Sequence, residues 1–279
     1  MDTTSIPKVQ MNDGHTIPQL GFGVFLVPPD EAAAAVTHAL RTGYRSIDTA
    51  AMYRNEQGVG EAIRSSGIPR EELFVTTKVW PSDYGRTETA DALRRSLEAL
   101  GDDYVDLYLL HWPAPGQGRY IEAYETLVEL RSQELTRSIG VSNFFEEPLA
   151  KVIDATGVVP AVNQVELHPR FEQRELRAYH EQHGILTEAW SPLGRGAILD
   201  DPIVTGIASE VGRKPAQVVL RWHIQLGNVV IPKSVTPARI EQNFDVFDFE
   251  LSADQIAEID QLDDPRARIG PDPARFNGS

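Results

Sequence analysis

Residues 43–62 read GYRSIDTAAMYRNEQGVGEA, and this short stretch combines three kinds of segment. A β-prone run at 44–47 ends in an acid, Asp48, and small residues lead from it to Tyr53. An apolar pattern at helical spacing follows, with Asn55 as the predicted helix cap. The order strand, loop, helix places a carboxylate at the end of a buried strand, where an isolated charge costs several kcal/mol. The rest of the chain therefore has to supply a partner for Asp48.

Strand-like and helix-like patterns alternate on both sides of this stretch. Residues 8–11 and 15–17 are predicted to form a β-hairpin, because the Asp-Gly pair between them is a strong turn signal. Core strands are predicted at residues 20–25, 46–47, 73–77, 105–110, 137–141, 161–165, 185–190 and 228–231. Helices are predicted at residues 29–40, 56–63, 87–100, 121–130, 148–155, 174–183, 203–211, 215–226, 240–244 and 253–262.

Strands that alternate strictly with helices predict an α/β protein with a parallel sheet, here a (β/α)₈ TIM barrel. A length of 279 residues fits one such barrel and no linker divides the chain, so we expect a single domain over residues 1–279. We expect the N-terminal β-hairpin to precede the barrel and the C-terminal tail, residues 265–279, to cover its mouth. An open Rossmann sheet is the alternative, but Gly21-Phe22-Gly23 lacks the third glycine of a dinucleotide-binding turn.

The composition narrows the class of protein. A net charge of −15 argues against a partner with a phosphate backbone, and the lack of cysteine excludes disulfides and thiolate metal sites. No apolar run reaches the roughly 18 residues of a membrane span, and residues 1–10 contain no apolar signal-peptide core. We therefore expect a cytoplasmic protein that binds neither nucleic acid nor a membrane.

Three successive predicted strands end in an ionisable residue: Asp48, Lys78 and His111. The carboxyl ends of barrel strands meet at one mouth, so these side chains should converge there, with Tyr53 in the adjacent loop. Alone, each residue is as well explained by a solvated rim, by packing or by a helix cap. Together they suit reduction of a carbonyl group: Asp48 offsets the charge of Lys78, and Lys78 lowers the pKa of Tyr53. Tyr53 is then the general acid, and His111 orients the substrate oxygen.

No side chain in this set can donate hydride, so the chemistry requires a cofactor. The stretches GYRSIDTAAMYRNEQGVG (43–60) and IPKSVTPARIEQN (231–243) resemble the two signatures of the aldo-keto reductases. TKVW (77–80), LLHWP (109–113), GVSNF (140–144), NQVELHP (163–169) and WSPLGRG (190–196) are further family-like segments in the same order. The chain resembles the prokaryotic branch that includes 2,5-diketo-D-gluconate reductases. The resemblance implies a monomer that uses NADP(H) to reduce small aldehydes and ketones, with Tyr53 as proton donor.

The resemblance also implies which residues bind NADP(H) across the barrel mouth. They are Gly23, Val24 and Asp48; Ser142, Asn143 and Gln164 on the nicotinamide carboxamide; Trp190 stacked on the ring; Ser191, Leu193 and Gly196 along the pyrophosphate; Lys233, Ser234 and Arg239 on the 2′-phosphate; and Val235, Thr236, Gln242 and Asn243 beside them. Two cations and a hydroxyl suit a phosphomonoester. Thr236 stands where some relatives have an arginine, which weakens the expected preference for NADPH.

Aromatic residues are predicted to bind the substrate beside His111. They are Phe22, Phe25, Trp80 and Trp112. The tail carries Arg266, Arg268 and Arg275, which either touch a substrate carboxylate or belong to a surface strap with no ligand role.

Two functions of other classes remain as alternatives. One is a non-catalytic, nucleotide-binding regulatory subunit that senses redox state, which would not need to keep Tyr53 and Lys78 together. The other is a metal-dependent barrel hydrolase, but the histidines at 15, 38, 168, 180, 183 and 223 do not form a ligand pattern. We therefore predict no metal site.

Overall fold

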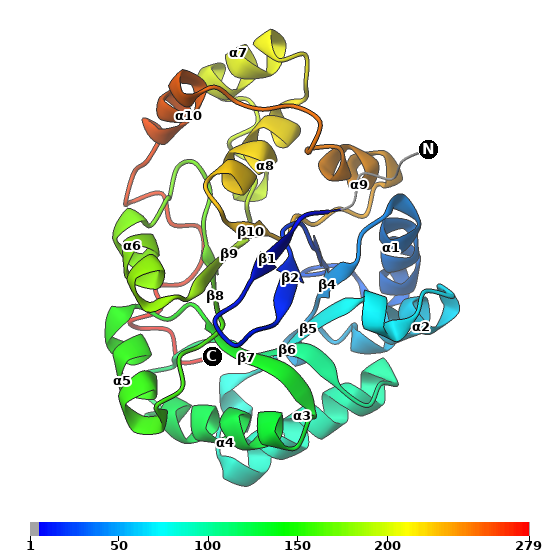
Figure 1. Cartoon of the computed structure of the whole chain (residues 1–279), viewed down its shortest axis with the longest axis vertical. Coiled ribbons are helices and arrows are strands. Elements are labelled where there is room, and N and C mark those ends of the chain that lie inside the picture. Colours follow the sequence, from blue (N-terminus) through cyan, green and yellow to red (C-terminus); the bar gives the residue numbers. More distant parts are fainter. Residues whose placement is uncertain (1–5, 279) are drawn as a thin grey trace.

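The computed structural model describes residues 6–278, so residues 1–5 and the last residue of the predicted tail, Ser279, lie outside the described part. Within it, eight parallel strands form one sheet, ordered as in the sequence (Figure 1). Leu20 pairs with Val230 in a parallel bridge, and the Gly21 amide donates to the Val230 carbonyl at 2.8 Å, so the sheet closes. The strands are β3 (Phe22–Gly23), β4 (Ser46–Asp48), β5 (Phe74–Val79), β6 (Val105–Leu110), β7 (Thr136–Ser142), β8 (Val162–Glu166), β9 (Leu186–Trp190) and β10 (Val229–Val230).

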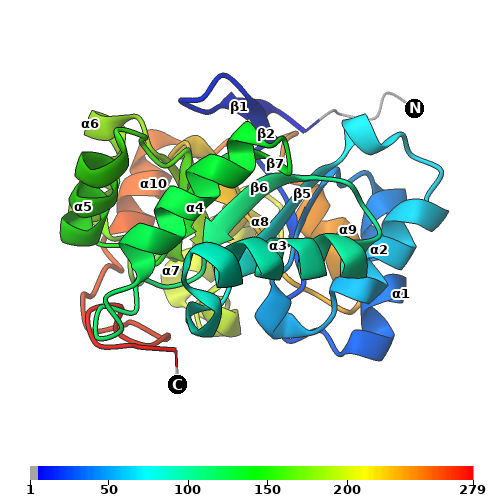
Figure 2. The same cartoon turned by 90° about the horizontal axis from the view of Figure 1, so that it is seen from below.

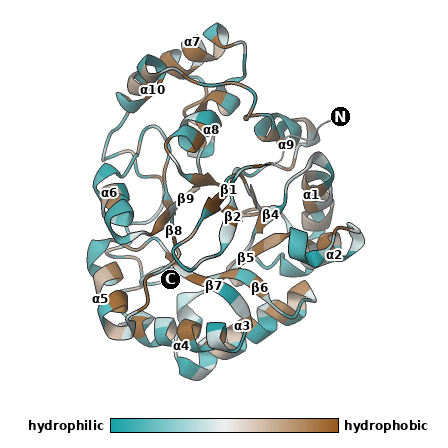
Figure 3. Ribbon diagram, in the orientation of Figure 1, coloured by the Kyte–Doolittle hydropathy of each residue, from teal (hydrophilic) through white to brown (hydrophobic). Residues whose placement is uncertain are grey.

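Helices surround the closed sheet and confirm the (β/α)₈ barrel. They are α1 (Pro29–Thr42), α2 (Glu56–Ser65), α3 (Arg86–Leu100), α4 (Tyr120–Ser132), α5 (Glu146–Thr156), α6 (Arg174–His183), α7 (Pro202–Glu210), α8 (Pro215–Gln225), α9 (Pro237–Phe244) and α10 (Ala253–Asp260). The strands are largely apolar, whereas the helices carry polar residues outward (Figure 3). On α3, for example, Leu93, Leu97 and Leu100 are all buried, as their spacing predicts.

The β-hairpin closes the amino-terminal end of the barrel. Its strands β1 (Lys8–Gln10) and β2 (Thr16–Pro18) pair antiparallel as predicted. Met11 and Ile17 pack against Leu107 and Val162 inside the barrel. Figure 2 shows the hairpin and the C-terminal tail at opposite ends of the molecule.

The tail crosses the opposite, carboxyl-terminal end, as predicted. The indole nitrogen of Trp80 donates to the carbonyl of Gly278 at 3.2 Å, just after β5. The backbone amides of Ile269 and Gly270 donate to the Glu166 carboxylate at the end of β8, at 2.5 and 2.7 Å. Gln117 donates to the carbonyl of Asn277 at 2.6 Å. The tail is therefore held across the mouth largely through its main chain.

One local prediction is wrong. Asn55 stands at the N-cap position of α2, but its side chain does not cap the helix. Its amide instead donates to the carbonyls of Val24 and Val27 at 2.9 and 3.1 Å, and its oxygen accepts from Thr49 at 2.9 Å. Asn55 thus ties the loop after β3 to the loop after β4, and both loops border the mouth.

Candidate active site

The buried ammonium of Lys78 on β5 is the centre of the site. Its nitrogen lies 2.6 Å from Oδ1 of Asp48, 2.9 Å from the carbonyl of Thr49 and 3.5 Å from the hydroxyl of Tyr53. An ammonium has three hydrogens, and these three acceptors account for them. The side chains of Lys78 and Asp48 are 0% and 3% exposed. Lys78 is therefore the partner that the sequence required for Asp48, and the structure brings both to Tyr53.

For both Lys78 and Tyr53, burial and the strongest neighbouring charge shift the pKa in opposite directions. Burial, the largest single effect, lowers the pKa of Lys78. The charge and hydrogen bond of Asp48, together with Tyr53 and Glu188, outweigh burial and raise that pKa. Burial raises the pKa of Tyr53, and Lys78 opposes this only in part. The sign of the predicted Lys78 effect is therefore right, but the net shift of the Tyr53 pKa is upward. Tyr53 keeps its proton at neutral pH, as a proton donor must.

His111 follows β6 and lies beside Tyr53. The two rings are 5.6 Å apart, and the indole of Trp80 stands edge-on to His111 at 5.0 Å. Burial, followed by the charge of Lys78, holds the pKa of His111 well below its usual range. The imidazole is therefore neutral and donates only one N–H hydrogen bond.

Aromatic rings form a continuous row across the mouth, from Phe25 through Tyr53, His111 and Trp80 to the tail. Phe25 lies 5.1 Å from Tyr53, and Phe276 lies 6.0 Å from Trp80. Phe276 also contacts Trp112 at 4.6 Å. The sequence-based prediction missed Phe276, whose one signal is an aromatic residue in a tail rich in proline and arginine.

Phe22 is not part of this row. It is 1% exposed and packs edge-on against Tyr44 at 5.6 Å. The Tyr44 hydroxyl donates to the carbonyl of Ile240 in α9, so Phe22 points outward, to the layer between strands and helices. Alternate strand residues face opposite sides of the sheet. The structure therefore places Phe22, which was predicted to bind the substrate, on the helix side of the sheet and apart from the aromatic row.

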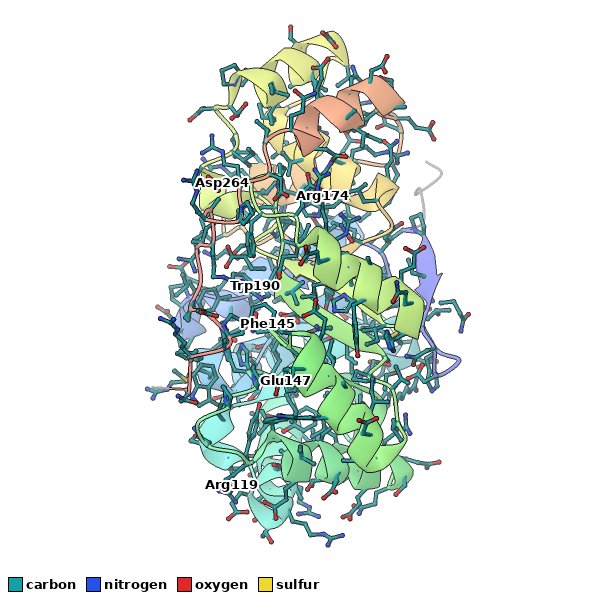
Figure 4. The ribbon with its side chains drawn as sticks, turned by 90° about the vertical axis from the view of Figure 1, so that its left-hand side faces the viewer. Arg119, Phe145, Glu147, Arg174, Trp190 and Asp264 are labelled. Atoms are coloured by element: carbon teal, nitrogen blue, oxygen red, sulfur yellow. The ribbon has the colours of Figure 1, made fainter. Side chains whose placement is uncertain are left out.

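The tail arginines are engaged away from the aromatic row. Arg266 pairs with Asp264, and Arg275 lies 3.8 Å from Asp272. The guanidinium of Arg268 lies over the ring of Phe171 at 4.5 Å and over the ring of Phe145, labelled in Figure 4, at 5.5 Å. These contacts favour the interpretation of the tail as a strap.

The residues predicted for the carboxamide form one hydrogen-bonded group. Asn143 has a positive φ of 65°, and its amide nitrogen donates to the His111 carbonyl at 3.0 Å. The indole of Trp190 donates to the Asn143 oxygen at 2.8 Å. Ser142 donates to the Gln164 carbonyl at 2.8 Å. The sequence reasoning did not consider Glu188 of β9, a buried acid within an apolar run, which accepts from Gln164 at 2.8 Å.

The predicted phosphate-binding residues lie around the start of α9. Lys233 and Arg239 are exposed, and within residues 6–278 neither forms an ion pair. Ser234 is buried and its oxygen accepts the Thr236 amide at 3.1 Å. Of the neighbouring predicted contacts, Val235 and Gln242 are exposed and Asn243 is buried.

The other predicted cofactor contacts lie at or just after the carboxyl ends of β3 and β9. Gly23 fits tightly, because a Cβ there would lie 2.9 Å from the Ile231 carbonyl, and Val24 is fully buried. Ser191 has a positive φ of 50°, and Leu193 and Gly196 are half-buried in the turn after β9.

Between residues 6 and 278, no group of three histidine, aspartate or glutamate side chains is placed to hold a metal ion. None of the helices described there is long and apolar enough to cross a membrane.

Comparison with known proteins identifies the family. A sequence model described as "Aldo/keto reductase family" matches residues 19–264. An aldo-keto reductase of Mycolicibacterium smegmatis is 55% identical over 97% of this chain and 98% of its own length. The methylglyoxal reductase DkgA of Escherichia coli is 49% identical over 97% of this chain and 98% of its own length. The crystal structure of a Gox0644 mutant in complex with NADPH has a TM-score of 0.94 at 49% identity, covering 97% of this chain and 98% of that one. These matches confirm the resemblance of the motifs, and the chain belongs to the aldo/keto reductase family.

Proposed function

We propose that this protein uses NADPH to reduce the aldehyde or ketone group of small carbonyl compounds, such as α-keto and diketo compounds, methylglyoxal and aldehydes. The observation that carries the proposal is the contact of the buried Lys78 with both Asp48 and Tyr53 beside the neutral His111. A pure redox sensor has no need of this costly buried charge. The family and the methylglyoxal reductase relative support the same activity.

The residues of the site have distinct roles in the proposed reaction. Bound NADPH would supply the hydride. Tyr53 would donate a proton to the carbonyl oxygen as negative charge develops there. Lys78 stabilises the phenolate that remains, and Asp48 keeps Lys78 charged. His111 donates its one N–H to the same oxygen and orients it. The aromatic row from Phe25 to Trp112 would hold the rest of the substrate.

The residues present fit the proposed cofactor. Trp190 is half-buried and its ring is fixed by Asn143, which suits stacking against a nicotinamide. Lys233 and Arg239 are unpaired cations within the described range, which suits a 2′-phosphate. We also propose that residues 1–279 form a single domain, and that the protein is a cytoplasmic monomer.

A substrate panel tests the proposed function. NADPH oxidation is followed at 340 nm with methylglyoxal, aromatic aldehydes and α-diketones, and in parallel with NADH. We expect turnover of several carbonyl compounds and a lower KM for NADPH. Tight binding of NADPH with no turnover on any of these compounds would contradict the proposal and favour the redox-sensing subunit.

Replacement of Arg239 by methionine is expected to raise the KM for NADPH by about 10- to 100-fold, the cost of losing a charge-assisted hydrogen bond. The KM for NADH should stay unchanged, because NADH has no 2′-phosphate. Arg94→Met removes an exposed cation from α3 and serves as the control. An equal rise in both KM values would show that Arg239 does not contact the 2′-phosphate.

A further inference from the structure

Inside the barrel, the side-chain amide of Gln164 lies between two carboxyl groups. Its nitrogen donates to Oδ2 of Asp48 at 2.7 Å and to Oε2 of Glu188 at 2.8 Å. An amide nitrogen has two hydrogens, so both are used. The amide oxygen of Gln164 is therefore the group left to meet a ligand. The reverse orientation would set that oxygen against two carboxyl groups, and it is excluded unless both are protonated.

Glu188 has no evident part in the proton-donating group, yet it is buried. Glu188 is 1% exposed, and it stands opposite Gln164 in the register of β8 and β9. Within residues 6–278, the carboxyl group of Glu188 makes one hydrogen bond, which it accepts from Gln164. A buried carboxyl group is costly and needs a reason. Glu188 also lies two residues before Trp190, so both side chains leave β9 on the same side.

We propose that Glu188 is a positioning residue, which fixes the Gln164 amide so that its oxygen accepts from the carboxamide nitrogen of the nicotinamide. This inference rests on the proposed function, because the nicotinamide is the ligand concerned. Without Glu188, one hydrogen of the Gln164 amide would lose its partner and the amide could turn. Strand β9 would then supply two groups for the nicotinamide. Trp190 stacks on its ring, and Glu188 orients Gln164, which binds its carboxamide.

The charge of Glu188 gives the inference a second consequence. The ionisable groups that face Glu188 are Asp48 of β4, Lys78 of β5 and Tyr53, whereas β10 presents apolar Val229. Burial, followed by the charge of Asp48, raises the pKa of Glu188 to about 8. Above that pH the ionised carboxylate disfavours the phenolate of Tyr53 and raises the pKa of Tyr53. Removing the charge should therefore lower the pKa of Tyr53.

Two variants test the inference. Dissociation constants for NADPH are measured by tryptophan fluorescence, and kcat and KM are measured from pH 6 to 10. Glu188→Leu offers no acceptor, and we expect NADPH to bind about tenfold more weakly, as for one lost hydrogen bond. Glu188→Gln keeps an acceptor but never ionises. We expect it to bind NADPH nearly as tightly as the wild type, while the alkaline limb of its reduction rate moves to lower pH.

A matched control separates these effects from a general loss of buried charge. Glu172→Gln neutralises another buried carboxyl group, which pairs with Arg174 away from the barrel interior. It should change neither NADPH binding nor the pH profile. If Glu188→Leu folds and binds NADPH like the wild type, the inference fails while the proposed function stands. Should Glu188→Leu not fold, Glu188→Gln decides the matter. If the alkaline limb of its reduction rate lies at the same pH as in the wild type, the inference is overturned. A wild type that neither binds NADPH nor reduces any carbonyl compound would overturn both.

Discussion

Replacement of Tyr53 by phenylalanine is expected to lower kcat for carbonyl reduction by about 10²- to 10⁴-fold, the usual contribution of a general acid. The phenyl ring can keep its contacts with Phe25 and His111, at 5.1 and 5.6 Å, so NADPH should bind nearly as tightly. The loss should therefore fall on kcat rather than on cofactor binding. Steady-state kinetics with methylglyoxal, together with a fluorescence titration of NADPH, measure the two quantities separately.

The chain offers a control for the loss of one hydroxyl group. The hydroxyl of Tyr124 on α4 is buried, and within the described residues it has no hydrogen-bond partner. Tyr124→Phe should therefore turn over like the wild type. If Tyr53→Phe did the same, the proposed proton donor would be wrong.

Replacement of Lys78 by methionine is expected to abolish measurable turnover and to lower the free energy of unfolding by about 3–5 kcal/mol, because it leaves the Asp48 carboxylate buried without its cation. Urea denaturation at pH 7 measures the loss of stability. The double variant Lys78→Met, Asp48→Asn removes both charges and should regain part of the stability without regaining activity. A single variant as stable as the wild type would show that the Asp48–Lys78 pair is not the buried pair described here.

The ends of the three strands that carry the site were predictable from the sequence, because an ionisable residue stands at or next to the end of each. Asp48, Lys78 and His111 follow apolar runs, and parallel strands of a barrel end at one mouth. The direction in which Phe22 points was not predictable in this way. Strand β3 has only two residues, which is too short for an alternating pattern to show which side faces the helices.

Contacts across long distances in the sequence were also not predictable from local patterns. Phe276 meets Trp80 and Trp112 only because the tail returns across the mouth. The net shift of the Tyr53 pKa depends on how deeply the phenol is buried, which no motif records. The amide bridge from Gln164 to Glu188 requires the register of β8 and β9.

The way in which the tail is attached bears on how the enzyme could change its choice of substrate. Glu166, Trp80 and Gln117 bind main-chain groups of the tail, which every non-proline residue provides. Asn277 also accepts from the Gly116 amide through its side chain, at 2.7 Å, but the other side chains around Phe276 can be exchanged by natural drift or by directed evolution without detaching the segment. Gly270 is an exception, because a Cβ there would lie 2.6 Å from the Trp190 ring. New selectivity could arise in this segment while the proton-transfer chemistry below it is inherited unaltered.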